Sequence, residues 1–316
     1  MTTQTSAAHA KLLDGVRVAG EIKSEVATEV IAWRGKYGVS PCLAVVRVGE
    51  DAASAVYVRN KVRTSQELGL HSEHHALPLA TTTEELLAVV AQLNGRPEVD
   101  GILVQLPLPP QIDEQRVLAA VDPQKDVDGF HPVNAGRLAL GQPTLAPCTP
   151  AGIIELLRRY EIPLRGARAC VVGRSNIVGR PMAQLLLQHD ATVTIAHSRT
   201  RDLPAVTREA DILVVAIGRA GFLRAVHVKP GAVVIDVGMN QVTDAAQARE
   251  FFGDDAEKRL KAIAKRGATL IGDVHPAEVS RVAGALTPVP GGVGPLTVAM
   301  LMRNTLEAAK RRRGWG

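Results

Sequence analysis

Residues 169–181 of this 316-residue chain read ACVVGRSNIVGRP, and they constrain the fold more than any other stretch. A short apolar run ends at Gly173, and a segment of helical character follows, beginning near Pro181. A helix that starts at such a turn binds anions at its N-terminus, so the pattern predicts a seat for a dinucleotide pyrophosphate. However, Ser175 replaces the second glycine of the usual fingerprint and Gly179 comes one residue late. Taken alone, the stretch fits an ordinary strand-to-helix turn equally well.

The next expected strand, residues 192–196, favours the dinucleotide interpretation. It ends in His-Ser-Arg-Thr, at the point where a site for NAD usually carries a carboxylate that binds the ribose 2′-hydroxyl. No carboxylate stands here, and Ser198 and Arg199 can instead donate hydrogen bonds to a 2′-phosphate. Arg174 adds a second guanidinium, whose planar fork matches phosphate. Arg199 by itself would be interpreted as a solvated loop cation. Together with Arg174 and the missing carboxylate, however, it predicts NADP rather than NAD.

Composition excludes several other classes of protein. With 46% hydrophobic and 22% charged residues the chain is globular, and its length suits two domains. The net charge of +5 suits an anionic small molecule. The aromatic content of 3% is too low for surfaces that stack single-stranded nucleic acid, so no nucleic-acid partner is expected. The basic run at residues 310–313 is expected to be a solvated helix end, where cations complement the helix dipole.

The cysteines and the first residues predict a cytoplasmic protein. Cys42, Cys148 and Cys170 are widely spaced and each lies in or beside an apolar run, so buried free thiols in a reducing compartment are expected. Residues 1–15 lack the apolar core of a signal peptide. No stretch of about eighteen apolar residues could span a membrane, and no membrane partner is expected.

Apolar runs that alternate with helical segments predict two α/β domains, the second with a Rossmann-like parallel sheet. The run GILVQL at residues 101–106 is typical of a strand covered on both faces. Residues 147–150 are expected to mark the boundary, and the polar residues 241–265 to form a helix-prone surface excursion. The expected strands are residues 43–48, 74–77, 101–106, 168–172, 192–196, 212–217, 232–237 and 270–274. The expected helices are residues 20–34, 52–68 and 83–94, with a last one that opens at 288–295 and runs to about 312.

Three polar side chains on or beside core elements are candidates for chemistry. Tyr57 and Lys61 are four residues apart on one expected helix, so a phenol and an amine share a face beside its apolar stripe. A snorkelling lysine beside an amphipathic tyrosine would look the same. Gln105 stands near the end of an apolar strand, where an unpaired amide would cost about 1–3 kcal/mol. It is either a satisfied core amide or part of a ligand site at the carboxyl edge of the sheet.

Other candidates are weaker. Asp126 and Asp128 lie in a loop that ends in Gly129, and Asp126 is expected to form the turn. His71, His74 and His75 lack an acidic or cysteine partner at ligand spacing and are expected to be solvated. No calcium loop, nucleophile elbow or P-loop is present, so we expect no metal site and no such hydrolase or phosphate site.

Taken together, these residues resemble one family: the bifunctional methylenetetrahydrofolate dehydrogenase/methenyltetrahydrofolate cyclohydrolases of one-carbon metabolism. The similar stretches follow the family's order over nearly the whole chain, and several of them are long and unusual. They are residues 54–61 (SAVYVRNK), 100–109 (DGILVQLPLP), 123–132 (PQKDVDGFHP), 147–152 (PCTPAG), 172–181 (VGRSNIVGRP) and 288–297 (PVPGGVGPLT).

The resemblance implies a two-domain architecture with an active-site cleft between the domains. Residues 1–148, completed by 289–316, would form the folate-binding catalytic domain, and residues 149–288 the NADP-binding domain. Lys61 matches the catalytic lysine, with Tyr57 and Gln105 as its active-site partners. Asp128 matches the carboxylate that binds the pterin. The other matched positions are Gly291 and Gly292 for the folate and Gly173, Arg174, Ser175, Gly179, Ser198, Arg199 and Met239 for NADP.

The implied activity is a two-step reaction that feeds one-carbon units to purine biosynthesis. NADP⁺ would oxidise 5,10-methylenetetrahydrofolate to the methenyl cation, and water would convert this to 10-formyltetrahydrofolate. A nearby cation disfavours the protonated amine, so Lys61 could act as general base. The family also implies a homodimer. The chain departs from the family at His275-Pro276, where an acidic-aromatic pair is common, and in the length of residues 241–265.

Three alternatives remain open at this point. A monofunctional dehydrogenase would have no need for Tyr57, Lys61 and Gln105 together. A non-catalytic NADP sensor would be expected to lack one of Lys61, Gln105 or Asp128. A dehydrogenase of a small acid or amino acid would lack the loops at residues 122–130 and 288–295.

Overall fold

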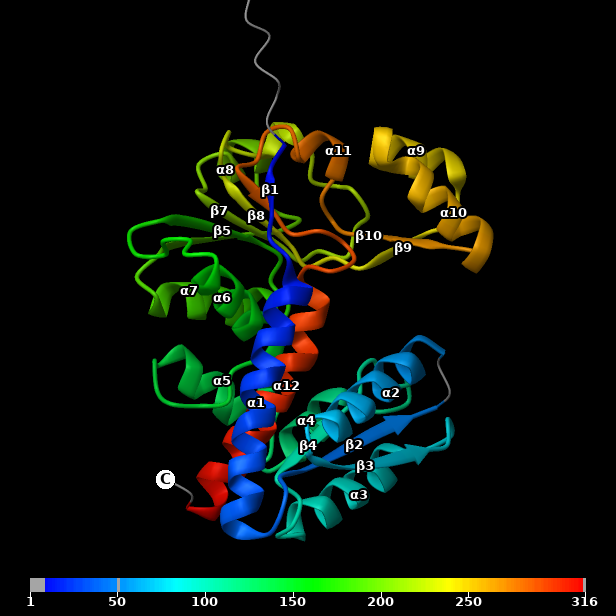
Figure 1. The fold of residues 1–316 in the computed structure, drawn as a ribbon, viewed down its shortest axis with the longest axis vertical. Coiled ribbons are helices and arrows are strands. Elements are labelled where there is room, and N and C mark those ends of the chain that lie inside the picture. The colour runs from blue at the N-terminus through cyan, green and yellow to red at the C-terminus, as the bar shows by residue number, and fades with distance from the viewer. Residues whose placement is uncertain (1–8, 50–51, 315–316) are drawn as a thin grey trace, which may run out of the picture. The chain divides into compact units, whose positions relative to one another are not determined.

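The computed structural model describes residues 9–49 and 52–314, with the backbone alone for residues 52–56 (Figure 1). Its contacts divide the chain into two compact units. The first unit comprises the residues up to Val18 together with Gly152–Leu296, and the second comprises Ala19–Ala151 together with the residues from Thr297 on. Both are α/β, as expected. The expected ligand-binding roles of the domains and their limits stay predictions.

The second unit is built on a three-stranded parallel sheet in the order β3-β2-β4. The buried strands β2 and β4 confirm that continuous apolar runs form the covered strands of this sheet. Their side chains share a core with α3 and α4. The strands are β2 (Cys42–Val48), β3 (His71–Leu77) and β4 (Gly101–Val104). The helices are α2 (Ala52–Glu67), α3 (Thr83–Gly95), α4 (Glu114–Ala120) and α5 (Pro132–Ala139).

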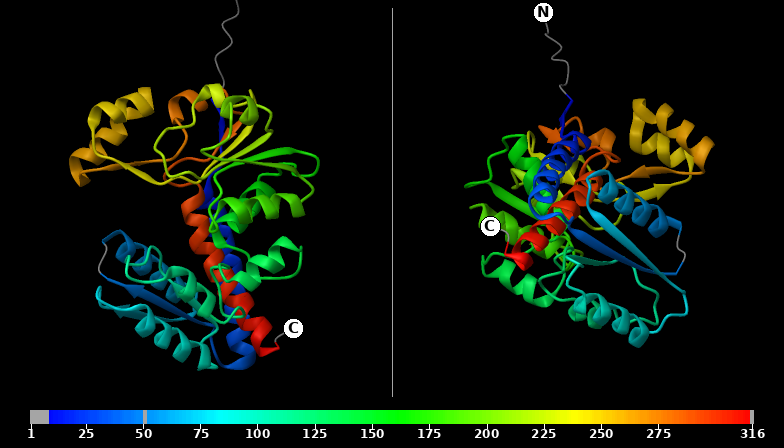
Figure 2. Two further views of the ribbon diagram at one scale, coloured as in Figure 1. Left: turned by 180° about the vertical axis from the view of Figure 1, so that it is seen from behind. Right: turned by 60° about the horizontal axis from the view of Figure 1, so that its bottom comes forward.

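Two long helices, α1 (Gly15–Tyr37) and α12 (Val293–Arg313), lie side by side along much of their length (Figures 1 and 2). Arg303 of α12 pairs with Glu25 of α1 at 2.6 Å, and Lys310 pairs with Glu29. These contacts join the start of the chain to its end.

The expectation of a solvated basic end on α12 was wrong for Arg312 and Arg313, although Arg311 is exposed. Arg312 and Arg313 are largely buried and bind both oxygens of Asp100, a carboxylate with no exposed surface, at 2.6–3.0 Å. Asp100 also accepts the Cys42 backbone N–H at 2.9 Å, so it needs cationic partners. The helix end is thereby fixed to the beginning of β4.

The first unit contains a six-stranded sheet in the order β1-β11-β8-β7-β5-β6, and every pairing is parallel. This confirms the expected Rossmann-like sheet. The strands are β1 (Lys11–Leu12), β5 (Arg168–Val172), β6 (Thr192–Ala196), β7 (Ile212–Val215), β8 (Val233–Asp236) and β11 (Ala285–Leu286). The remaining elements of this part of the chain are α6 (Cys148–Arg159), α7 (Gly179–Gln188), α8 (Leu203–Thr207), η1 (Ala225–His227) and α11 (Pro276–Val279).

Residues 240–271, which we name the excursion, form a small substructure within the first unit. Two antiparallel strands, β9 (Asn240–Val242) and β10 (Thr269–Ile271), enclose α9 (Ala245–Phe252), η2 (Gly253–Asp255) and α10 (Ala256–Arg266). The two helices lie side by side (Figure 1), and with the hairpin they enclose an apolar cluster that includes Ala248 and Phe252. The excursion therefore has helical character, as expected, but it also has a core of its own.

Among the residues that the structure describes, no helix is both long and apolar enough to cross a membrane. The three cysteines are buried and free, as expected.

Candidate active site

Lys61 and Gln105 meet in the second unit. Lys61 lies on α2, and its Nζ donates a hydrogen bond to Gln105 Oε1 at 3.0 Å. Gln105 stands one residue beyond β4, not inside the strand as expected, and its backbone N–H donates to Val46 O at 2.8 Å. Its Nε2 donates to the neighbouring Leu106 O at 2.6 Å. The amide group is thus held at both ends and presents its oxygen to the lysine.

Tyr57 lies one helical turn before Lys61 on α2. Its side chain is 38% exposed, and partial burial raises the pKa of the phenol, so it stays protonated at neutral pH. A protonated phenol can donate a hydrogen bond as well as present an aromatic face.

Asp128 belongs to the same group by its electrostatics. Burial raises the pKa of its carboxyl to about 6, the positive charge of Lys61 opposes this shift, and the negative charge of Asp126 adds to it. An aspartate whose pKa is displaced by burial beside a cation is typical of a functional site. The structure therefore brings together Lys61, Gln105 and Asp128, which are far apart in the sequence.

The loop that carries Asp128 is held in place by the neighbouring residue Asp126. Its carboxylate accepts the backbone N–H groups of Gly129, Phe130 and His131 at 2.8–3.2 Å, which confirms the expected turn-forming role. Asn134 adds a side-chain hydrogen bond to the same carboxylate at 2.9 Å.

Two buried residues that the sequence analysis missed also hold this loop. Lys125 is 1% exposed, and its Nζ donates to three carbonyl oxygens, those of Leu93, Asn94 and Arg96, around the end of α3. Asn304 of α12 donates to Val127 O at 2.8 Å and to Ala146 O at 3.0 Å. Asn304 could have been recognised from the sequence, because it places an amide on an otherwise apolar face of the last helix.

In the first unit, the predicted nucleotide residues gather at the carboxyl edge of the sheet. Val172 aligns with Ala196 on one side and with Val215 on the other, so the turns after β5, β6 and β7 begin at one level. β5 pairs with β6 on one side and β7 on the other, and the strand order therefore reverses beside Gly173. Ligands of open α/β sheets bind at such a reversal.

Glycine is required at two positions of the turn after β5. Gly173 has φ +130°, and a Cβ there would lie 2.2 Å from Ala216 O. A Cβ on Gly179 would lie 2.4 Å from Gly173 O. Ser175 Oγ accepts the N–H groups of Val178 and Gly179 at 3.1 and 3.2 Å. The serine thus closes the turn, and α7 begins at Gly179, two residues earlier than expected.

Arg174, Ser198 and Arg199 are exposed at this edge of the sheet. The turn after β6 is fixed by His197, whose Nδ1 accepts the Arg199 backbone N–H at 3.1 Å and whose own N–H donates to Thr200 Oγ1 at 2.8 Å. Met239, which is 46% exposed, follows the carboxyl end of β8.

A pair of buried aspartates, also missed from the sequence, organises the rest of this edge. Asp273 accepts the backbone N–H groups of Ile217, Gly218 and Arg219 at 2.6–2.9 Å. Asp236 accepts those of Gly238, Asp273 and Val274 at 2.8–3.0 Å, and burial raises its pKa to about 7. Each aspartate precedes a valine and has a glycine nearby, in Asp-Val-Gly at 236–238 and Gly-Asp-Val at 272–274, and this shared pattern could have revealed the pair.

The loop with Gly291 and Gly292 contacts the start of α1 in the first unit. Val16 N–H donates to Gly291 O at 3.1 Å, and a Cβ on Gly15 would lie 1.7 Å from Gly292 O. Gly291 has φ +107°, a conformation that favours glycine. A Cβ on Gly292 would lie 2.6 Å from Pro288 O, so the backbone requires glycine at both 291 and 292.

Two sequence models of one family match this chain. The tetrahydrofolate dehydrogenase/cyclohydrolase catalytic domain matches residues 13–128, and the NAD(P)-binding domain of the same family matches residues 147–313. The chain belongs to the tetrahydrofolate dehydrogenase/cyclohydrolase family. The expected family is therefore confirmed.

Relatives in this family are similar over almost their full length. The bifunctional protein FolD of Koribacter versatilis is 58% identical over 305 residues, which cover 96% of this chain and 98% of that protein. The protein of the same name from Caulobacter vibrioides strain NA1000 is 54% identical over 307 residues, covering 97% and 99%.

Solved structures of the family agree with the fold. The bifunctional methylenetetrahydrofolate dehydrogenase/cyclohydrolase of Campylobacter jejuni is 42% identical with a TM-score of 0.86, and the match covers 96% of this chain and 99% of that one. The Trypanosoma brucei enzyme, solved with NADP and an inhibitor, is 38% identical with a TM-score of 0.86, covering 96% and 98%.

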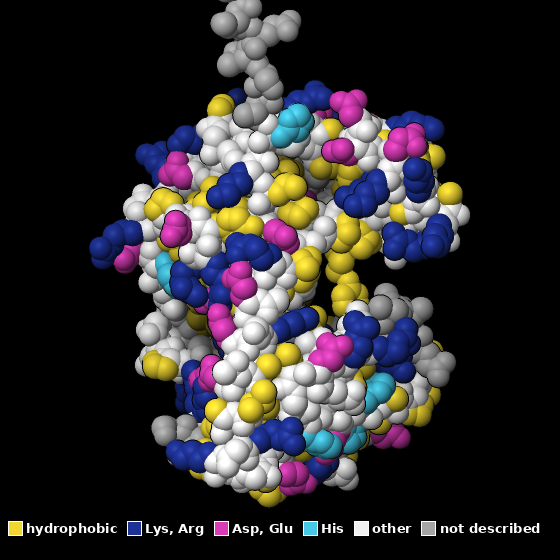
Figure 3. Space-filling view, in the orientation of Figure 1, with side chains coloured by type: hydrophobic (Ala, Val, Ile, Leu, Met, Phe, Trp, Pro, Cys, Tyr) yellow, Lys and Arg dark blue, Asp and Glu magenta, His cyan; other side chains and the backbone are white. Residues whose placement is uncertain are grey.

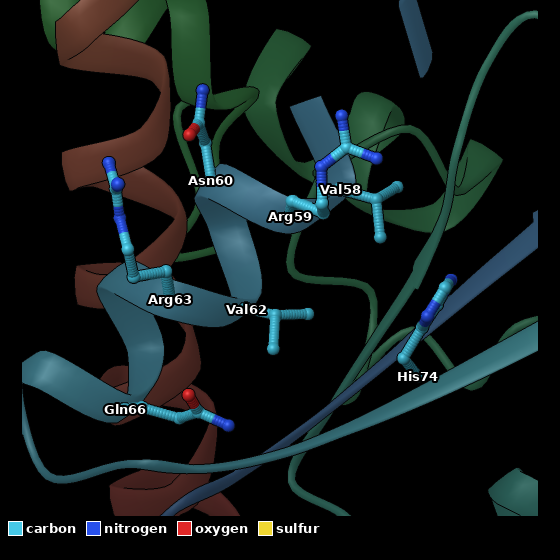
Figure 4. A pocket seen from close by; sticks show the side chains of 7 residues that line it. All are labelled: Val58, Arg59, Asn60, Val62, Arg63, Gln66 and His74. Atoms are coloured by element: carbon cyan, nitrogen blue, oxygen red, sulfur yellow. The ribbon is translucent and has the colours of Figure 1, made fainter. Parts of the chain in front are cut away.

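A hollow of about 430 Å³ lies on another face of α2 in this dehydrogenase/cyclohydrolase (Figure 4). Asn60 and Arg63 point away from His74, so the polar groups do not converge on one point, although Lys and Arg side chains gather over α2 (Figure 3). Tyr57 and Lys61 do not line it. The hollow is therefore distinct from the predicted catalytic group. The lining residues are Val58, Arg59, Asn60, Val62, Arg63, Gln66 and His74.

His71 and His74 are exposed, as expected, but the expectation that the histidines of β3 lack an acidic or cysteine partner at ligand spacing was wrong for His71. Cys42 lies opposite His71 across the sheet, and potential ligand atoms of Cys42, His71 and Glu73 lie within 4.8 Å of one another. Arg96, however, binds both oxygens of Glu73 at 2.7 and 2.8 Å, which lowers the pKa of that carboxyl to about 2. Burial raises the pKa of the Cys42 thiol to about 12. The group is thus an ion pair beside a protonated thiol.

Proposed function

We infer that this chain catalyses two consecutive steps: NADP-dependent oxidation of 5,10-methylenetetrahydrofolate to 5,10-methenyltetrahydrofolate, and hydrolysis of that product to 10-formyltetrahydrofolate. Sequence models of both family domains match it, and its full-length relatives are named bifunctional. The observation that carries the hydrolytic half is the 3.0 Å hydrogen bond between Lys61 Nζ and Gln105 Oε1. A monofunctional dehydrogenase offers no use for that pair.

In the proposed assignment, residues 1–148 and 289–316 bind the folate. Asp128 accepts two hydrogen bonds from the 2-amino group and a ring N–H of the pterin, as a carboxylate does from a guanidinium. Tyr57 presents its ring and hydroxyl to the substrate, and the backbone of Gly291 and Gly292 lines the folate site.

For the hydrolysis we assign Lys61 as the general base. Its neutral amine takes a proton from water as the water oxygen bonds to the methenyl carbon, and the same group returns that proton to N5 as the bond from that carbon to N5 breaks. The remaining hydroxyl proton leaves to solvent as the formyl C=O forms, which accounts for the positive charge of the methenyl substrate. Gln105 Oε1 accepts a hydrogen bond from the amine and so fixes the direction of its lone pair. The formyl group remains on N10.

Residues 149–288 bind NADP in this proposal, and the turn after β5 fits a dinucleotide. A side chain at Gly173 or Gly179 would fill the space at the strand-order reversal, where backbone and phosphate approach closely. Arg174, Ser198 and Arg199 supply donors for the 2′-phosphate, and Met239 borders the site. NADP⁺ when bound supplies the oxidant for the methylene carbon.

A coupled spectrophotometric assay tests the function. Purified protein with methylenetetrahydrofolate and NADP⁺ should form NADPH without lasting accumulation of the methenyl compound, and added methenyltetrahydrofolate should be hydrolysed faster than in buffer. Accumulation of the methenyl compound would establish a monofunctional dehydrogenase. If the protein bound NADP⁺ but catalysed neither reaction, the alternative of a non-catalytic NADP sensor would be supported.

The basis of cofactor choice is tested with Arg199→Ala. Loss of a charge-assisted hydrogen bond should lower kcat/KM for NADP⁺ by roughly 10- to 100-fold and leave the value for NAD⁺ within twofold. Arg201→Ala, at an exposed neighbouring position, is the matched control. Equal kcat/KM values for NADP⁺ and NAD⁺ in the unmodified protein would contradict the proposed preference for NADP.

We further propose a cytoplasmic homodimer that acts on tetrahydrofolate derivatives, without nucleic-acid partners, and serves purine biosynthesis. The buried free thiols support a reducing compartment. Light scattering coupled to gel filtration measures the assembly, and a monomer at micromolar concentration would contradict it.

A further inference from the structure

Arg259 of the excursion reaches out of its own substructure to the loop at residues 288–292. Its Nη2 donates to Val289 O at 2.7 Å, a short distance for a charge-assisted hydrogen bond. The guanidinium lies over the Phe252 ring, 4.4 Å from its centroid, within the range of a cation–π contact. Through Arg259, helix α10 thus places a positive charge against the backbone just before Pro290-Gly291-Gly292.

Arg259 is half-buried, and its partners are unusual for a buried cation. The described residues place no carboxylate at ion-pair distance from its guanidinium. Burial lowers its pKa, and the more distant negative charge of Asp255 opposes that shift. A desolvated charge without a direct ion pair costs free energy that an apolar side chain of similar size would avoid. A residue needed only to fill this space would therefore be apolar. An arginine can donate to carbonyl groups, which an apolar residue cannot: Nη1 donates to Leu270 O within the excursion at 3.5 Å, and the shorter hydrogen bond, from Nη2, goes to Val289 O outside it.

The loop at 288–292 is held at its two ends by other parts of the first unit. Before it, Asp236 N–H donates to Thr287 Oγ1 at 2.8 Å, and near its end Val16 N–H donates to Gly291 O at 3.1 Å. The hydrogen bond from Arg259 falls between these two anchors. It is the contact by which the excursion holds the loop.

We propose that Arg259 is a positioning residue for the folate, which fixes Val289 and through it the backbone of Gly291 and Gly292. This rests on the proposed function, which assigns those two glycines to the folate site. The outer surface of the excursion carries mixed Lys, Arg, Asp and Glu side chains (Figure 3), whereas Arg259 contacts the loop at residues 288–292.

The test is the cyclohydrolase reaction, which requires no nucleotide. Arg259→Met keeps the volume and removes the donor, and it should raise KM for methenyltetrahydrofolate about tenfold, the effect of losing one charged hydrogen bond. KM for NADP⁺ in the dehydrogenase reaction should stay within twofold. Arg259→Lys, which keeps one donor, should recover part of the loss. Lys261→Met, exposed on the same helix, is the matched control and should change neither constant.

A lower Tm with an unchanged folate KM in Arg259→Met would show that the residue is structural and would overturn the proposal. An equal rise of both KM values would also overturn it. If Arg259→Met does not fold, the Arg259→Lys variant is the test. A raised KM for methenyltetrahydrofolate with an unchanged KM for NADP⁺ supports the proposal. Unchanged KM values for both ligands contradict it. Lack of turnover in the unmodified protein would instead defeat the proposed function.

Discussion

Lys61 is the residue to which we assign the hydrolytic step, and this assignment can be tested separately from folate binding. Lys61→Met removes the amine but keeps the length of the side chain, and loss of a general base should slow hydrolysis of methenyltetrahydrofolate by 10²- to 10⁴-fold. Folate binding, measured by fluorescence titration, should remain detectable because Asp128 is intact. The exposed Arg63 on the same helix, changed to Met, should leave hydrolysis within twofold. Full hydrolysis by Lys61→Met would remove the lysine from the mechanism.

Asp128 should make the stability of the protein depend on pH. Burial raises the pKa of its carboxyl from 3.8 to about 6 in the folded protein. Between these values the folded state binds a proton that the unfolded chain lacks, so stability falls as pH rises. Its contribution is fully present below pH 4 and lost above pH 6. Asp128→Asn, neutral throughout, should therefore gain more Tm over the unmodified protein at pH 7.5 than at pH 5.0. An equal Tm difference at both values would contradict this.

The same residue explains what could be predicted from the sequence about the site. The motif with Asp128 marks the carboxylate that we assign to the folate, and Asp126 follows from turn chemistry. The contacts that support the loop could not be predicted. Lys125 and Asn304 donate hydrogen bonds to carbonyl groups of other elements, and the sequence does not indicate which carbonyl group a buried donor will contact. Candidate ligand-binding residues could thus be named from the sequence, whereas the contacts that support their loop could not.

At the scale of elements, long apolar runs were predicted well because their burial follows directly from hydrophobicity. β2, β4 and β5 lie within or beside the expected ranges. The short helices α4 and α5 were not expected, because their starts depend on caps: Asp113 and His131 accept backbone N–H groups through side chains that resemble any loop residue. α6 crosses the expected boundary since prolines in a first turn are compatible with a helix.

Helix α12 should stabilise the Asp128 loop through Asn304. Asn304→Leu keeps the volume but leaves the carbonyl groups of Val127 and Ala146 without this donor in a buried place, which should cost about 1–3 kcal/mol of unfolding free energy. Urea denaturation measures the change. Arg311→Ala, exposed on the same helix, should stay within about 0.5 kcal/mol. If both variants unfolded at the same urea concentration as the unmodified protein, α12 would not support the loop in this way.

For the molecule as a whole, the proposed assignment gives the catalytic groups of hydrolysis and the nucleotide turn to different units. The groups assigned to hydrolysis, Lys61, Gln105 and Asp128, belong to the second unit, whereas the turn assigned to NADP belongs to the first. Oxidation needs both ligands, and hydrolysis needs the folate alone. A defect confined to the nucleotide turn should therefore separate the two activities, in the opposite sense to Lys61→Met.

Gly173→Ala is such a defect. The added Cβ would lie 2.2 Å from Ala216 O at a φ of +130°, so the turn must move, and a displacement of about 1 Å at a reacting ligand costs on the order of 100-fold in rate. NADPH formation should fall by that factor while hydrolysis of methenyltetrahydrofolate stays within twofold. Gly35→Ala, a helical glycine with open space around it, controls for the substitution itself and should preserve both rates. Parallel loss of both reactions in Gly173→Ala, with an unchanged Tm, would mean that hydrolysis also depends on the nucleotide turn.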